Sequence, residues 1–123
     1  MTPVGTWRIV DDQAQQATAY LVIVERDGLL WGHIDELLRP SDRLAVCRAC
    51  KDDLKNQPIL GLEIVRHAKK AEGEDVWDDA SLLSPETGEF YALRMRPVDG
   101  GQQLEMDVLV DTRWRTQAWQ RVK

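Results

Sequence analysis

The sequence has no excess of positive charge and no long apolar run. Its 16 Lys and Arg residues are outnumbered by 21 Asp and Glu residues, which gives a formal net charge of -5. Nucleic acids and anionic membrane surfaces bind basic protein faces, so this balance argues against both as partners. No apolar stretch approaches the ~20 residues that a transmembrane helix needs, so the sequence predicts no membrane span.

Cysteine and histidine are scarce, with two residues of each. Two cysteines cannot build a disulfide-rich scaffold. A zinc site takes about four ligands, and neither His33 nor His67 lies at finger-like spacing from the cysteines. The acidic pairs Asp52-Asp53 and Asp78-Asp79 fit no calcium loop. We therefore expect no metal site and no cofactor.

Phenylalanine is almost absent, whereas tryptophan is abundant: the chain has one Phe and five Trp. An indole ring has a large flat face and one N–H donor, which suits it to barrel ends and pocket walls. With 43% hydrophobic and 30% charged residues, the composition is that of a globular protein. The 123 residues predict a single domain over residues 1–123.

Short stretches of alternating or β-branched residues recur along the chain. Alternation places Trp7 and Ile9 on one face of the first stretch. In a later stretch it places Leu104, Met106, Val108 and Val110 on an inward face. Asp27-Gly28 is a strong hairpin signal, because glycine adopts the positive φ of a tight turn. Gly32 lies within a strand pattern, where it suggests a bulge or a close backbone approach. Strands are expected at residues 5–11, 17–25, 29–37, 58–65, 76–83, 90–96, 104–110 and 115–122.

Turns and one long connection separate these strands. Turns are expected at residues 12–16, 84–88 and 99–101, a charged loop at 66–75, and the long connection at 39–57, with a short helical turn near 51–55. About eight strands at this spacing are typical of a sandwich or barrel, and no long helix is indicated. Consecutive hairpins favour an all-β, antiparallel up-and-down meander closed into a barrel, because closure removes exposed strand edges.

Four segments of the chain carry a recognisable pattern. They are Gly5-Thr6-Trp7, the Cys47-x-x-Cys50 loop with residues 58–64 (PILGLEI), the run from Trp77 to Tyr91, and residues 115–121 (RTQAWQR). Together they resemble one bacterial family, domain of unknown function 2147, and the resemblance covers essentially the whole chain. The chain also departs from the family pattern, since members usually carry Gly-Gly, Asp-Pro and Gly where this chain has Asp78-Asp79, Ser84-Pro85 and Trp114.

The resemblance implies an exported protein with a lipocalin-like barrel. On that basis we expect a periplasmic or secreted location, although the chain carries no signal peptide, which by itself would equally fit a cytosolic protein. Lipocalin-type barrels carry Gly-x-Trp on the first strand and an arginine that packs over this tryptophan. The pair here would be Trp7 with Arg121, or with Arg115. Such cation–π stacking is worth ~0.5–2 kcal/mol and would close one barrel end.

Cys47 and Cys50 form the one constellation with obvious chemical potential. A thioredoxin-like thiol pair needs its first cysteine at a helix N-terminus in a βαβ unit, and a zinc site needs further ligands. The chain shows neither context. A short disulfide that pins the long loop in an oxidising compartment is therefore favoured, with reactive thiols and a metal site as alternatives.

The candidate ligand-binding residues lie on the third strand and at the barrel ends. Trp31, His33 and Asp35 share one strand face and would line a pocket if that face points inward. A His–Asp pair could support acid–base chemistry, but no nucleophile can be placed beside it, so no catalytic residue is assigned. The candidate pocket or barrel-end residues are Trp7, Trp31, His33, Tyr91, Trp119 and Arg121.

Two functions of different kinds fit this sequence. One is a non-enzymatic binding protein of the bacterial envelope, whose calycin-like barrel holds a small apolar or amphipathic ligand. The other is an interaction module whose core is filled by Trp7, Trp77 and Trp119, and which presents the Cys47–Cys50 loop to an envelope protein. A thiol redox protein is a third hypothesis. The oligomeric state is not indicated.

Overall fold

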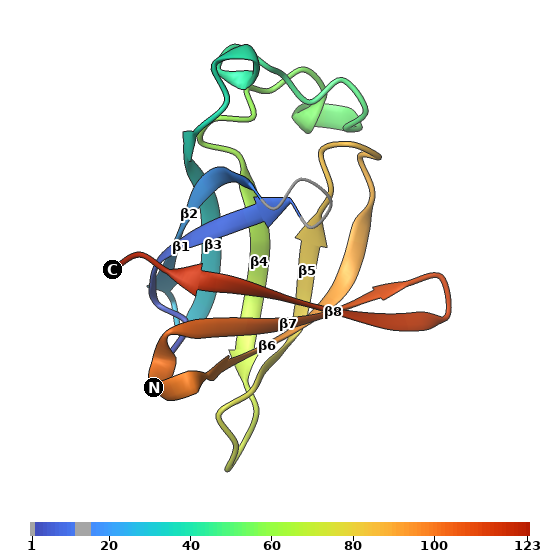
Figure 1. Ribbon diagram of the computed structural model, residues 1–123. Coiled ribbons are helices and arrows are strands. Elements are labelled where there is room, and N and C mark those ends of the chain that lie inside the picture. Colours follow the sequence, from blue (N-terminus) through green and yellow to red (C-terminus); the bar gives the residue numbers. More distant parts are fainter. Residues whose placement is uncertain (1, 12–15) are drawn as a thin grey trace.

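The protein is a closed antiparallel barrel of eight strands in which each strand pairs with the next and β8 pairs with β1 (Figure 1). The predicted fold class, an all-β antiparallel meander closed into a barrel, is confirmed. The computed structural model describes residues 2–11 and 16–123. The strands are β1 (Gly5–Asp11), β2 (Gln16–Arg26), β3 (Leu29–Leu37), β4 (Glu63–Lys70), β5 (Trp77–Leu83), β6 (Phe90–Val98), β7 (Gln103–Val110) and β8 (Arg113–Arg121).

Helical structure in the described residues is confined to three 3-10 turns: η1 (Pro40–Asp42), η2 (Asp52–Leu54) and η3 (Asp99–Gly101). η2 confirms the helical turn that was expected near residues 51–55. No helix in this part of the chain is long and apolar enough to cross a membrane. The predicted turn at residues 12–16 lies outside the described residues, except for Gln16, which belongs to β2.

The fourth strand begins later than the sequence pattern predicts. Residues 58–65 do not form a strand and residues 66–75 are not all loop, because β4 spans Glu63–Lys70. Pro58 makes only an isolated bridge with Val46, and Gly61 takes a left-handed φ of 87° that interrupts the chain before β4. The strand then continues through charged residues because Ala68 still points into the core.

Alternate residues of the strands point inward and form one apolar core. In β7 these are Leu104, Met106 and Val108, as the alternation predicted. Burying a side chain of this size contributes about 1.5–3 kcal/mol. A Cβ on Gly32 would lie 3.1 Å from Val65 Cβ, and the β3–β4 pairing shifts register on both sides of this glycine. The expected close approach at Gly32 is thus confirmed.

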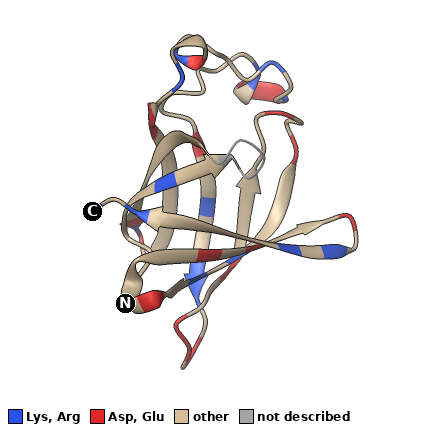
Figure 2. Ribbon diagram, viewed as in Figure 1, with Lys and Arg blue, Asp and Glu red and all other residues tan. Residues whose placement is uncertain are grey.

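The two ends of the barrel differ in how they are covered. The long connection between β3 and β4 lies over one end, and the β4–β5 hairpin and the β6–β7 turn lie at the other (Figure 1). Charged residues occur in loops and hairpin ends as well as along the strands (Figure 2). The interior layer is apolar instead, so a ligand inside the barrel would meet polar groups mainly at the ends.

Candidate functional site

A cavity of about 600 Å³ lies inside the barrel, near the end that the long connection covers. This volume falls within the ~300–1,000 Å³ that is typical of small-molecule pockets. The walls are apolar, and polar groups gather where the long connection and the β5–β6 turn meet the barrel. The wall residues are Ile9, Ala19, Ile34, Leu37, Ile64, Leu82, Leu83 and Trp119, and the rim includes Thr18, Arg39, Asp42, Ala45, Ser84, Glu86 and Gln117.

Small side chains keep this part of the interior open. Protein interiors usually pack at the density of organic crystals. Here two positions that face the cavity are alanines, Ala19 in β2 and Ala45 in the long connection. The largest buried side chain of the barrel, Trp7, lies outside the cavity lining. The core is therefore filled near Trp7 and hollow toward the long connection.

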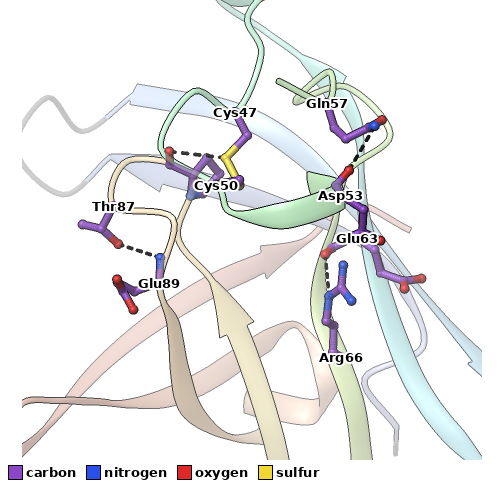
Figure 3. Close-up of a disulfide and its surroundings, with 9 residues drawn as sticks. Cys47, Cys50, Asp53, Gln57, Glu63, Arg66, Thr87 and Glu89 are labelled. Carbon is purple, nitrogen blue, oxygen red and sulfur yellow. Dashed lines mark hydrogen bonds between the residues drawn. A yellow bond between two sulfur atoms is a disulfide. The ribbon is translucent and has the colours of Figure 1, made fainter. Parts of the chain in front are cut away.

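The long connection over the cavity is held by its own backbone and by a disulfide. Cys47 N–H donates to the Gln57 carbonyl at 2.8 Å, and Asn56 N–H donates back to the Cys47 carbonyl at 2.8 Å. Cys47 and Cys50 are joined in a disulfide, with Cα atoms 5.4 Å apart, and both are buried. The favoured disulfide reading is borne out, and it closes a compact ring within the connection (Figure 3).

This disulfide ring docks on the β5–β6 turn (Figure 3). Cys47 Sγ lies 3.7 Å from the Pro85 carbonyl oxygen, and Lys51 Nζ lies 2.8 Å from Glu89 Oε1. The hydrogen bond to Glu89, and then its charge, raise the pKa of Lys51 above its usual value. A Cβ on Gly88 would lie 1.9 Å from the Ala49 carbonyl oxygen, so only glycine permits this approach. The turn supplies Ser84, Pro85 and Glu86 to the cavity rim, and the ring packs against this turn from outside the cavity lining.

An ion pair that the sequence analysis missed lies on this rim. Arg39 Nε lies 2.6 Å from Asp42 Oδ2, at the start of the long connection. Both residues line the cavity. Their position in the long connection was the feature of the sequence that could have identified them, because loops held by a rigid barrel commonly carry its binding groups. The rim thus carries one guanidinium, which is paired with Asp42, and a second carboxylate at Glu86, where the polar end of an amphipathic molecule would lie.

The opposite end is sealed by Trp7 and Arg121, as the lipocalin resemblance implied. The Arg121 guanidinium lies 4.4 Å from the Trp7 ring centroid, and Trp7 is fully buried. Arg121 Nε donates to the Gly101 carbonyl at 2.6 Å, and its other nitrogens donate to carbonyls of the N-terminal segment. A Cβ on Gly5 would lie 2.4 Å from Arg121 Nη1, which explains the glycine of the Gly-x-Trp motif.

The predicted pocket residues of β3 lie on the outside of the barrel. The expectation that Trp31 and His33 face inward is wrong, because the inward face of β3 carries Leu30, Gly32 and Ile34. The Arg26 guanidinium covers Trp31 at 4.5 Å from the ring centroid. His33 Nε2 lies 3.9 Å from Asp35 Oδ1, in an exposed pair.

The remaining predicted residues are divided between the two faces of the wall. Trp119 lines the cavity, and its indole nitrogen has no hydrogen-bond partner within the described residues. Tyr91 does not line the cavity, and its hydroxyl lies 3.1 Å from the Thr87 hydroxyl beside the β5–β6 turn. The structure therefore brings Trp119 to the cavity, Trp7 and Arg121 to the closed end, and no other predicted pocket residue to either.

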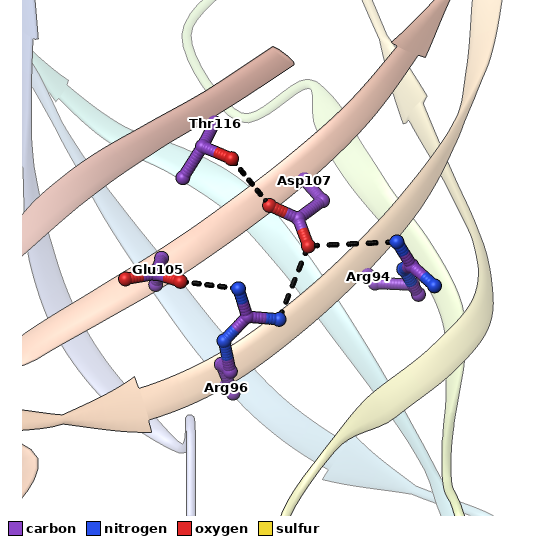
Figure 4. Close-up of polar contacts among 5 residues, drawn as sticks. All are labelled: Arg94, Arg96, Glu105, Asp107 and Thr116. Carbon is purple, nitrogen blue, oxygen red and sulfur yellow. Dashed lines mark hydrogen bonds and ion pairs between the residues drawn. The ribbon is translucent and has the colours of Figure 1, made fainter. Parts of the chain in front are cut away.

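A polar network ties together the outer faces of β6, β7 and β8 (Figure 4). Asp107 accepts hydrogen bonds from Thr116 Oγ1 at 2.7 Å and from Arg96 Nη1 at 3.1 Å. The hydrogen bond from Thr116, followed by the bond and charge of Arg96 and the charge of Arg94, holds the pKa of Asp107 below its usual value, although burial opposes this. Arg96 also pairs with Glu105. The network stabilises the wall rather than the cavity.

A closed meander of eight antiparallel strands, hollow at one end and sealed by Gly-x-Trp and an arginine at the other, defines a lipocalin-like barrel. A solved structure shares this fold: HP1028 from Helicobacter pylori, described as belonging to the lipocalin family. The two align with a TM-score of 0.83 over 100% of this chain and 85% of that chain, at 14% sequence identity. Identity this low shows the fold alone.

The chain belongs to the bacterial family domain of unknown function 2147 (DUF2147), described as "uncharacterized protein conserved in bacteria". The family model matches residues 5–121, which spans the barrel from β1 to β8. No curated protein matches the sequence.

Proposed function

We propose that this protein is a non-enzymatic binding protein that holds a small apolar or amphipathic ligand in its barrel. The observation that carries the proposal is the cavity of about 600 Å³, with apolar walls and polar groups confined to its rim. An apolar chain on these walls would leave water, which is favourable by about 25 cal/mol per Å² of buried apolar surface. A polar end would lie at the rim, where Arg39, Asp42 and Glu86 supply hydrogen-bond donors and acceptors.

The cavity also bears on the other two hypotheses. An interaction module with a filled core needs no space of this size beside Trp119. A thiol redox protein needs an accessible cysteine at a helix N-terminus, whereas Cys47 is fully buried and Cys50 nearly so. The disulfide supports a location in the bacterial envelope, because such bonds persist in oxidising compartments. A periplasmic or secreted location is therefore part of the proposal.

The test is displacement of an apolar fluorophore, N-phenyl-1-naphthylamine, by palmitate. The wild-type protein should bind the fluorophore and release it as palmitate is added. Ala19→Phe, which fills the cavity, should bind at least about tenfold more weakly, equivalent to 1.4 kcal/mol. Ala118→Phe is the matched control, because Ala118 is exposed on β8. If Ala19→Phe does not fold, Ala45→Trp at the rim replaces it.

Equal binding by the Ala19→Phe and Ala118→Phe variants would show that the fluorophore lies elsewhere and would overturn the proposal. Native mass spectrometry of protein from its bacterial host would then address the physiological ligand. A co-purifying mass that survives desalting, and is lost in the Ala19→Phe variant, would identify the compound in the cavity. The location is tested separately by fractionation of the same cells.

A further inference from the structure

A second hollow region lies on the outer wall of the barrel, across β4, β5 and β6. It consists of two depressions of about 430 and 420 Å³ that share Asp78 and Asp79. The first extends toward the β4–β5 hairpin and includes Lys69 and Lys70. The second extends across β6 to Trp114 on β8. The two depressions form one elongated groove, and no residue of the interior cavity's rim belongs to it.

A distortion of the sheet builds the floor of this groove. β4 and β5 pair at Arg66–Ser81 and again at Lys69–Asp78, but not between these points. Within the gap, His67 and Asp79 take left-handed φ angles of 49° and 55°. A His67 ring nitrogen lies 2.9 Å from the Asp79 carbonyl oxygen and steadies this arrangement.

Such backbone is uncommon inside strands. Left-handed conformations are unfavourable for most side chains and less so for Asp. Distortions of this kind concentrate at functional sites, where they re-aim side chains. Here the distortion places His67 and Asp79 at a surface depression, while Ala68 and Ala80 beside them stay in the core.

Two exposed aromatic rings stand at the Trp114 end of the groove. Phe90 is 47% exposed and Trp114 is 45% exposed, which is unusual for rings of this size. One face of each ring is covered by an arginine: Arg66 lies 5.4 Å from the Phe90 centroid, and Arg94 lies 4.1 Å from the Trp114 centroid. The cation–π contacts orient the rings and leave aromatic surface open to a ligand.

Hydrogen-bonding groups lie beside these rings. Asp78 and Asp79 supply carboxylate acceptors, and within the described residues neither is in an ion pair. Ser81 supplies a hydroxyl and Arg94 supplies donors, and both line the groove. The Arg94 Nε atom is buried without a partner in the described part of the chain. The lining balances the cations Lys69, Lys70 and Arg94 with the carboxylates Glu72, Asp78 and Asp79, so it favours a neutral ligand over an ion. The polar floor disfavours a hydrocarbon.

We propose that this groove binds a neutral oligosaccharide built of hexopyranose rings. The C–H face of one ring would stack on Trp114, and its hydroxyls would bond to Asp79 and Arg94. Carboxylates and guanidinium groups suit vicinal hydroxyls, because each offers two acceptors or donors side by side. The adjoining depression beside Lys69 extends the site beyond a single ring. This site is independent of the ligand proposed for the interior cavity.

The test follows tryptophan indole N–H signals by NMR while three soluble tetrasaccharides are added: cellotetraose, maltotetraose and N-acetylchitotetraose. At least one should shift the Trp114 signal saturably, with a dissociation constant in the millimolar range or tighter. Trp114→Ala should weaken binding at least about tenfold, measured by calorimetry. Leu60→Ala is the control, because Leu60 is also an exposed apolar side chain but lines neither the groove nor the interior cavity.

Asp79→Asn gives a second variant, since asparagine tolerates the left-handed conformation and keeps the fold. It should weaken saccharide binding and leave palmitate displacement in the cavity unchanged. No saturable shift with any of the three tetrasaccharides would overturn the proposal. So would an equal loss of affinity in the Leu60→Ala and Trp114→Ala variants.

Discussion

Gly88→Ala should detach the disulfide ring from the β5–β6 turn. Gly88 has a φ of 73°, and a Cβ there would lie 1.9 Å from the Ala49 carbonyl oxygen and 2.9 Å from the Cys50 nitrogen. The left-handed φ alone should cost about 1–2 kcal/mol for an alanine. The clash with backbone atoms cannot be relieved by rotating a side chain, so we expect a further ~1–3 kcal/mol of the kind that overpacking produces.

Gly73→Ala separates these two contributions. Gly73 has nearly the same φ, 76°, but a Cβ there would meet no atom within 4 Å. The difference between the two variants in the free energy of unfolding, measured by urea denaturation, therefore reports the clash. Trypsin cleavage after Lys51 should also rise in Gly88→Ala and not in Gly73→Ala. Equal destabilisation with equal cleavage would refute the docking of the ring on the turn.

Three further predictions concern the closed end, the disulfide and the outer wall. Trp7→Ala should destabilise the barrel by ~3–5 kcal/mol, because it empties a fully buried site; a fall in melting temperature of only a degree or two would contradict this. Replacing Cys47 and Cys50 by serine should cost no more than about 2 kcal/mol, because the bridge closes a very short loop; circular dichroism should show an intact barrel, and loss of the sheet signal would contradict the prediction. Asp107→Asn should cost about 1–3 kcal/mol at pH 7 by removing the carboxylate that Thr116 and Arg96 bind. Since the folded-state pKa of Asp107 is lowered, the wild-type advantage should be complete above about pH 3.9 and shrink as the pH falls below it; an advantage that stays constant down to pH 2 would refute this role.

The barrel and most of its strand boundaries follow from local pattern. Asp27-Gly28, the turn at residues 84–88 and the alternation of β7 each depend on a few neighbouring residues, and each was predicted correctly. The fourth strand failed because its signal is not local. Leu60 and Leu62 alternate like strand residues, yet the start of β4 is set by the pairing of Glu63 with His33 of β3. Charged residues that follow in β4 face solvent, so their sequence resembles that of a loop.

The candidate site could be predicted only in part. A shift of one residue in strand register exchanges the side chains that face the core with those that face solvent. Trp31 and His33 form an attractive pair in the sequence, but Gly32 is the residue that faces the core. One step of register thus places both on the outer wall. The cavity itself depends on what is missing at Ala19 and Ala45, and a sequence does not show where neighbouring strands fail to fill space. Trp119 was found because β8 carries a family motif around it.

The two ends of the barrel are held by contacts of unequal strength, which predicts where the proposed ligand would exchange. At the closed end, Arg121 stacks on Trp7 and bonds to three backbone carbonyls. At the cavity end, the disulfide ring rests on the turn through the Gly88 contact and one exposed ion pair, which contributes at most about 1 kcal/mol. Exchange should therefore occur at the cavity end. Gly88→Ala should speed dissociation of N-phenyl-1-naphthylamine in stopped-flow measurements, whereas Arg121→Lys, which loses the planar stack, should lower stability and leave the dissociation rate unchanged. Faster dissociation in Arg121→Lys alone would place the exchange route at the sealed end instead.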